Sequence, residues 1–149
     1  MIKKVLYTAE ATAEGGRGGH VRTPNGRLDL ELDVQEELGG PGGPGTNPEE
    51  LFAAGYAACF QSVLLRLAAQ QKLAMPRARL TARIGIGPTS EGGFALNAAL
   101  DLDATELDHV EATSLMEEAH QQCPYSRATR GNIDVSLSVG GTPIERLAA

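Results

Sequence analysis

The sequence predicts an α+β fold in which antiparallel sheets are wrapped around one long, buried central helix. Four segments alternate apolar and polar residues with a period of two, as strands with one buried face do. They are 28–34, 78–86, 94–102 and 133–139. The run 51–69 is almost entirely apolar or small, and 105–121 has the spacing of an amphipathic helix. Strands with one apolar face and few helices indicate α+β, and the 149 residues suit a single domain spanning 1–149.

The composition argues against some classes of partner and location. The formal net charge is −6 and no block of basic residues occurs, which argues against nucleic acid as a partner. The start of the chain, 1–6, has a basic character but no sustained apolar segment or cleavage site of a signal peptide. We therefore expect a cytoplasmic protein, where cysteines stay reduced unless they are catalytic or redox-sensing.

The first third of the chain predicts three strands. Segment 2–13 contains β-forming residues and should form the first strand, while 20–23 should form the second. The Pro-Asn-Gly sequence at 24–26 is a strong turn signal, and the alternating segment 28–34 should run antiparallel after it. The glycine-rich segment 39–45 is then a loop that leads into the central helix.

The central helix has a clear start. Asn47 is a good N-cap, Pro48 suits the first helical position, and Glu50 stands where a capping-box carboxylate reaches back. Its apolar part approaches the length of a membrane span, but Gln61 and Arg66 would be costly in hydrocarbon. We therefore expect no membrane span.

A helix that is apolar nearly all round is buried on most sides. One small sheet from the same chain covers one side only, so a second chain is a natural source of the remaining cover. Dimerisation is a hypothesis at this point.

The rest of the chain predicts a hairpin, a helix and a last strand. The strands 78–86 and 94–102 are joined by a glycine turn, and Thr105 is a plausible N-cap for the helix that runs to about Gln121. The apolar positions of that helix are Leu107, Val110, Leu115 and Ala119. Segment 133–139 is the last strand.

Cys59 lies about three turns into the central helix, where the helix dipole no longer activates a thiol. An apolar setting raises the pKa of a thiol, so Cys59 is inert unless a cation stands beside it. Judged alone, it is most simply a buried core cysteine.

The second cysteine, Cys123, follows the amphipathic helix and precedes Pro124, which disfavours helical conformation in the residue before it. At a helix end it should be more accessible than a cysteine in mid-helix. Two cysteines far apart in sequence are compatible with a peroxidatic and a resolving thiol, and equally with two unrelated buried thiols.

Arg17 stands among four glycines in 15–19, which let the backbone approach another element closely. It is either a solvated loop residue or a functional cation. Glu49, two residues after the predicted N-cap, either complements the helix dipole or holds a guanidinium by a bidentate pair.

A metal site is a weaker interpretation. His120 and Cys123 have the spacing H-x-x-C, and Cys59, His20 or His109 would have to supply further ligands. Structural zinc sites usually use paired C-x-x-C or H-x-x-x-H spacings, which do not occur here, so we expect no metal.

Three long motifs together resemble the organic hydroperoxide resistance (Ohr) proteins, a branch of the OsmC-like superfamily. They are 7–19 with Gly-Gly-Arg at 15–17, 45–60 with Thr-Asn-Pro-Glu at 46–49 and Cys59, and 120–134 with Cys-Pro-Tyr-Ser at 123–126. The match spans nearly the whole chain. It implies an OsmC-like fold and an intertwined homodimer with long central helices wrapped by sheets.

The resemblance also implies a thiol-dependent peroxidase that reduces alkyl or lipid hydroperoxides to alcohols. In that family the cysteine at Cys59 is peroxidatic and the one at Cys123 is resolving, so a Cys59–Cys123 disulfide is expected. The family's arginine matches Arg17, which would stabilise the thiolate and the peroxide, and its glutamate matches Glu49, which would orient Arg17. With that cation in place, we expect a lowered pKa for Cys59, opposed by desolvation.

The family has no bound cofactor, and it suggests protein-bound dihydrolipoamide as the external dithiol that reduces the disulfide. Phe52, Phe60 and Phe94 are candidates for the lining of an apolar substrate pocket, although each is by default an ordinary core residue. Two alternatives stay open: a general OsmC-type osmotic or oxidative-stress peroxidase, and an apolar-ligand binding protein with structural cysteines.

Overall fold

The structure is a computed structural model that describes residues 1–145, and its chain divides into two compact units, Met1–Leu51 and the part from Phe52 onward. Three α-helices and two sheets make it a mixed α+β protein, as predicted. The assignment of the whole chain to one domain stays a prediction.

The first unit contains a small antiparallel sheet of three strands in the order β1-β2-β3. β1 is Thr12–Glu14, β2 is His20–Arg22 and β3 is Asp29–Glu31. The 3₁₀ turns η1, Gly16–Gly18, and η2, Glu36–Leu38, complete its regular structure. The turn predicted at 24–26 is confirmed: Gly26 has a φ of 72° and its N–H donates to the Thr23 carbonyl.

The predicted first strand is mostly wrong. Only 12–13 of the segment 2–13 lie in β1, and Ile2, Val5, Leu6 and Tyr7 are exposed. A strand needs a partner for its backbone hydrogen bonds. Within the N-terminal segment β2 pairs only with residues 12–14, and among the described residues nothing pairs with the part before them.

Helix α1 is Pro48–Gln70, and its start confirms the predicted cap. The Asn47 Oδ1 accepts the N–H of Glu50 at 2.8 Å. The Glu50 carboxylate accepts from the Asn47 side-chain amide and the Thr46 hydroxyl, both at 3.1 Å. It therefore reaches back to the cap as predicted, but it bonds side chains there, where a capping box would bond the backbone N–H.

Only one stripe of α1 is fully buried in the second unit. Its members are Tyr56, Phe60, Val63, Leu64, Leu67 and Ala68. They are spaced as one face of a helix. The opposite positions, among them Ala58 and Leu65, are exposed. The predicted burial on most sides is therefore not found within this unit.

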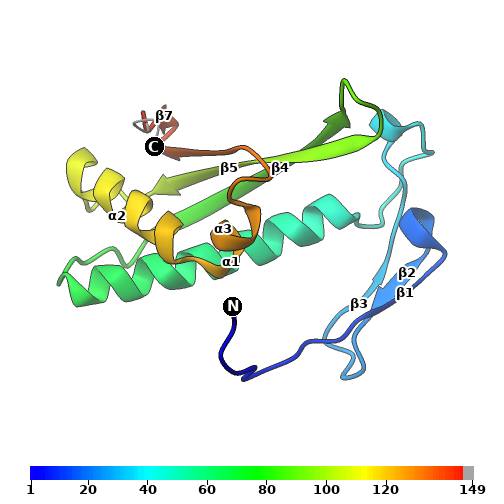
Figure 1. Cartoon of the computed structure of the whole chain (residues 1–149), viewed down its shortest axis with the longest axis horizontal. Coiled ribbons are helices and arrows are strands. Elements are labelled where there is room, and N and C mark those ends of the chain that lie inside the picture. Colours follow the sequence, from blue (N-terminus) through cyan, green and yellow to red (C-terminus); the bar gives the residue numbers. More distant parts are fainter. Residues whose placement is uncertain (146–149) are drawn as a thin grey trace. The chain divides into compact units, whose positions relative to one another are not determined.

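The second unit holds a four-stranded sheet in the order β4-β5-β6-β7. Figure 1 shows the long β4 and β5 strands of this sheet. The strands are β4, Arg79–Pro88, β5, Phe94–Asp103, β6, Val135–Val139, and β7, Thr142–Pro143. The β4–β5 hairpin is antiparallel as predicted, in register from Arg79↔Asp103 to Pro88↔Phe94. β6 pairs with β5 in parallel, because the helical connection between them returns the chain to the same end of the sheet.

That connection contains α2, His109–Gln122, and α3, Pro124–Thr129. The predicted cap at Thr105 is wrong: Asp108 caps α2, and its side chain and that of Glu111 form a reciprocal capping box. Leu115 and Ala119 are buried as predicted, but Val110 is 77% exposed because its spacing from them places it on the opposite face of α2.

Among the described residues, α1 alone is long and apolar enough to cross a membrane. Core helices of soluble proteins meet the same criterion. Here the buried stripe of α1 packs in one hydrophobic cluster with residues of β5, α2 and β6, such as Leu100, Leu115 and Leu137.

Candidate active site

The two cysteines, 64 positions apart in sequence, meet in the second unit. The Sγ atoms of Cys59 and Cys123 are 3.8 Å apart, and both thiols are reduced. A disulfide needs about 2 Å between its sulfurs, so a short movement would join them. The structure therefore brings together the two thiols whose relation the sequence left open.

Cys123 owes its position to the junction between α2 and α3. It has extended backbone angles, φ −64° and ψ 128°, as expected before Pro124. Its N–H donates to the Ala119 carbonyl at the end of α2, and its carbonyl accepts from the Arg127 N–H in α3. The predicted accessibility is wrong: Cys123 is fully buried, whereas Cys59 is partly exposed.

The pKa of the Cys59 thiol is raised, opposite to the predicted direction. Burial is the largest cause, and the neighbouring Cys123 thiol raises it further, while the backbone N–H of Tyr125 lowers it. Because the thiolate is the nucleophile, this environment holds Cys59 in its less reactive form. The need for a cation that the sequence indicated is therefore still present.

The first unit holds the arginine that the sequence analysis singled out. The Arg17 guanidinium donates from both terminal nitrogens to Glu49, at 2.8 and 2.7 Å, in a bidentate ion pair. The Glu49 side chain is 10% exposed and that of Arg17 is 37% exposed. The predicted bidentate partnership of these two residues is confirmed.

The glycines around Arg17 are required by the shape of its loop. Gly15 has a φ of 77°, and a Cβ on Gly19 would overlap the carbonyl of Glu14. Only glycine avoids both problems, and the tight 3₁₀ turn that results presents Arg17 to Glu49.

Gln35 is a further member of this group that the sequence analysis missed. Its Nε2 donates to the Glu49 Oε2 at 2.9 Å, so one carboxylate oxygen accepts from both Arg17 and Gln35. Gln35 precedes the turn η2 in a loop. A lone glutamine in a loop carries no sequence signal for such a contact.

Together these contacts lower the pKa of Glu49 from 4.5 to about 2, with the Arg17 hydrogen bond as the largest cause, burial opposing it and Gln35 assisting. A carboxyl group with a depressed pKa stabilises the folded state above its unfolded pKa, and that contribution is lost as pH falls through the folded pKa. Glu49 therefore stays ionised throughout the neutral range.

We expect Glu49→Gln to lower the free energy of unfolding by about 2 kcal/mol at pH 7, because it leaves Arg17 without its anionic partner. The difference from the wild type should shrink between pH 4.5 and about pH 2, where Glu49 takes up its proton. Urea unfolding across this range measures it, with the exposed Glu10→Gln as control. A difference independent of pH would contradict the ion-pair account.

The three phenylalanines predicted for the substrate pocket have different environments. Phe60 is fully buried in the core, and Phe94 is 66% exposed at the start of β5. Phe52 makes edge contacts with Tyr56 and Tyr125, at centroid distances of 6.0 Å. Their shared role in a pocket stays a prediction, and Phe94 does not share the core with the other two.

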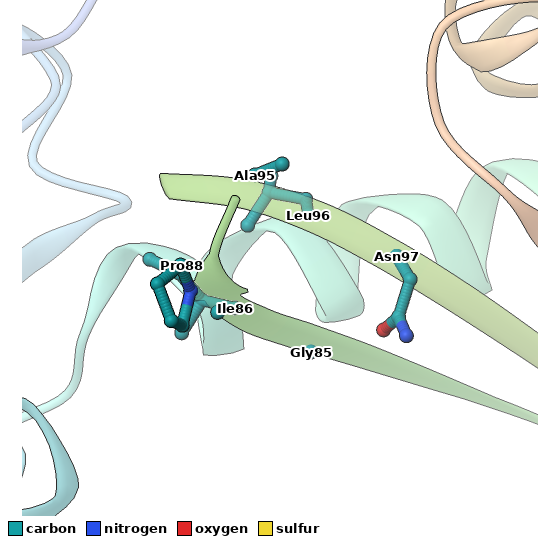
Figure 2. A pocket seen from close by; sticks show the side chains of 7 residues that line it. Gly85, Ile86, Pro88, Ala95, Leu96 and Asn97 are labelled. Atoms are coloured by element: carbon teal, nitrogen blue, oxygen red, sulfur yellow. The ribbon is translucent and has the colours of Figure 1, made fainter. Parts of the chain in front are cut away.

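A hollow of about 280 Å³ lies against the β4–β5 hairpin (Figure 2). It is lined by 85–88 and 95–97, with the Asn97 amide as its polar side chain. Its lining contains no thiol and no charged group, so it is not the candidate active site. No cluster of three or more His, Cys, Asp or Glu side chains that could hold a metal occurs within 1–145.

Known proteins resemble this chain over most of its length. The family described as OsmC-like protein matches residues 40–138. The organic hydroperoxide resistance protein of Xanthomonas axonopodis pv. citri is 50% identical over 138 residues, which are 92% of this chain and 96% of that protein.

Solved structures of relatives have the same fold. The organic hydroperoxide resistance protein of Legionella pneumophila is 51% identical with a TM-score of 0.86, covering 91% of this chain and 98% of that one. The corresponding protein of Bacillus subtilis is 41% identical with a TM-score of 0.83, covering 91% and 99%. The chain therefore belongs to the OsmC-like family, and within it to the organic hydroperoxide resistance proteins.

Proposed function

We propose that this protein is a cysteine-based peroxidase that reduces organic hydroperoxides to alcohols. The observation that carries the proposal is the 3.8 Å separation of the Cys59 and Cys123 sulfurs. Cys59 is the partly exposed member of the pair and Cys123 is fully buried. This suits a first thiol that reacts with the substrate from solution and a second, buried thiol that reacts only with the first.

The reaction proceeds in two steps. The Cys59 thiolate attacks the distal oxygen of the hydroperoxide, the O–O bond breaks, and the alkoxide takes up a proton to leave as an alcohol. Cys59 then carries a sulfenic acid. The Cys123 thiol attacks that sulfur, the sulfenic oxygen leaves as water, and a Cys59–Cys123 disulfide forms.

In this proposal Arg17 activates Cys59. Burial and Cys123 raise the pKa of the Cys59 thiol, so a positive charge is needed to favour its thiolate. Arg17 is suited to this role because Glu49 accepts two of its N–H groups and fixes the plane of the guanidinium. The remaining N–H donors would then stabilise the peroxide oxygens as negative charge develops on them.

The disulfide must be reduced before another turnover. An external dithiol supplies the two electrons, and the family resemblance indicates a lipoylated protein carrying dihydrolipoamide. Such a cycle suits a reducing compartment such as the cytoplasm. Phe52 and Tyr125, whose rings make an edge contact, offer an apolar surface that would favour an alkyl hydroperoxide over hydrogen peroxide as substrate.

We propose further that the protein is a homodimer. Exposed apolar residues occur in both units and are costly to leave in water. They are Ile2, Val5, Leu6 and Tyr7 near the N-terminus, and Ala54, Ala58 and Leu65 on α1. Light scattering should give twice the 15.6 kDa mass of one chain. A mass equal to one chain would remove the dimer.

The function is tested by intact mass under non-reducing conditions, before and after one equivalent of cumene hydroperoxide. A loss of about two mass units, reversed by dihydrolipoamide, is the expected result. A gain of about 16 mass units would show oxidation of Cys59 without resolution. An unchanged mass would contradict the peroxidase and favour structural cysteines.

A further inference from the structure

A chain of buried polar groups crosses the core beside the cysteine pair. The Tyr56 hydroxyl lies 2.9 Å from the Ser126 Oγ, which in turn lies 3.0 Å from the His120 Nδ1. The Thr129 hydroxyl lies 3.3 Å from that of Tyr56. All four side chains are buried, with at most 4% of any residue exposed. This hydrogen-bond network joins α1, α2 and α3.

The position of this hydrogen-bond network follows from the sequence spacing of its members to the cysteines. Tyr56 is three residues before Cys59, while His120 and Ser126 are three residues before and after Cys123. Residues three apart on a helix share a face, so Tyr56 lies one turn from Cys59 on α1. His120 and Ser126 bracket the junction that holds Cys123. The hydrogen bonds therefore tie both sides of that junction to the helix that carries the other sulfur.

Two further contacts hold the same junction. The Arg130 guanidinium donates to the His120 carbonyl at 2.7 Å, and the Tyr125 ring lies against that of Tyr56 with centroids 5.6 Å apart. The ring fits because Gly55 has no side chain: a Cβ there would lie 2.8 Å from the Tyr125 hydroxyl oxygen.

We propose that Tyr56, Ser126 and His120 are positioning residues that keep Cys123 within reach of Cys59 while Cys59 carries its sulfenic acid. The inference rests on the proposed peroxidase function. Hydrogen bonds between buried groups have fixed directions and are costly to break, so they fix the position of α3 relative to α1. We expect loss of the network to slow the second step, since only that step forms a bond to the Cys123 sulfur.

The test separates the two steps by rapid quenching and intact mass. Tyr56→Phe removes one hydroxyl at nearly constant volume, and Ser126→Ala removes the central hydroxyl of the chain. In both variants we expect the sulfenic acid to form at the wild-type rate within a factor of two. The disulfide should form about tenfold more slowly, so the species about 16 mass units heavier accumulates.

Two controls distinguish positioning from a loss of stability. Ser62→Ala removes an exposed hydroxyl that donates to the Ala58 carbonyl on the same helix, away from the network. Leu137→Val weakens the core from β6, and its melting temperature is compared with those of the network variants. Both controls should form the disulfide at the wild-type rate.

The positioning role is overturned if Tyr56→Phe and Ser126→Ala resolve at the wild-type rate, or if Leu137→Val is slowed as much at equal stability. A wild-type protein that forms neither sulfenic acid nor disulfide would instead refute the peroxidase itself. The two failures are therefore distinguishable.

Discussion

Cys59→Ser is expected to abolish the reduction of organic hydroperoxides, lowering the rate by about a thousandfold or more, because a serine hydroxyl is a far weaker nucleophile at neutral pH. Consumption of cumene hydroperoxide with dihydrolipoamide as reductant measures this loss. The substitution replaces one partly buried sulfur by oxygen and leaves the core residues Tyr56 and Phe60 unchanged, so the variant should remain folded.

Cys123→Ser provides the matched comparison, since it removes the other sulfur of the pair. This variant should consume one equivalent of hydroperoxide and then stop, because the sulfenic acid on Cys59 has no thiol to condense with. Its mass should rise by about 16 units. If Cys59→Ser kept a substantial rate, or if Cys123→Ser turned over as fast as the wild type, the assigned roles would be wrong.

The local elements of this fold were readable from the sequence where a short pattern determines them. The cap at Asn47 depends on side chains within three residues of one another, and the β4–β5 hairpin depends on period-two alternation around a glycine turn. For Arg17 and Glu49 the residues alone left two roles open each, and the family resemblance favoured the pair that the structure shows.

The predictions that were wrong concern properties that depend on which other segment a residue contacts in the folded protein. Segment 2–13 has strand-forming residues, but a strand exists only where a partner pairs with it. Thr105 and Asp108 are both acceptable caps, and the reciprocal bond with Glu111 decides between them. The parallel pairing of β6 follows from the length and path of α2 and α3, which no period in the sequence reveals.

The thiols illustrate the same limit at the candidate site. Position at a helix end suggested that Cys123 would be accessible, yet the turn between α2 and α3 points it into the core. The direction of the Cys59 pKa depends on burial, on Cys123 and on the Tyr125 N–H. Cys123 and Tyr125 are more than 60 residues away in sequence, so the motif around Cys59 could not indicate the net direction of its pKa shift.

The second large effect concerns Arg17, whose charge we propose to lower the pKa of Cys59. We expect Arg17→Ala to lower the rate of hydroperoxide reduction about a hundredfold, since an opposite charge close to a thiol lowers its pKa by 1–3 units. The pH dependence of Cys59 alkylation, measured in a Cys123→Ser background, should shift to higher pH in the Arg17→Ala variant. The rate of Arg17→Lys should lie between those of the wild type and of Arg17→Ala, because an ammonium keeps the charge but not the bidentate geometry with Glu49.

Arg22→Ala is the matched control, because Arg22 is an exposed arginine of the same unit, in β2. It changes the net charge equally and should leave both the rate and the alkylation profile unchanged. If Arg17→Ala kept the rate within a factor of two, the activation of Cys59 by Arg17 would be wrong. The Tyr125 N–H would then favour the Cys59 thiolate without help from Arg17. The Arg17–Glu49 pair would serve only to hold the glycine-rich loop against the start of α1.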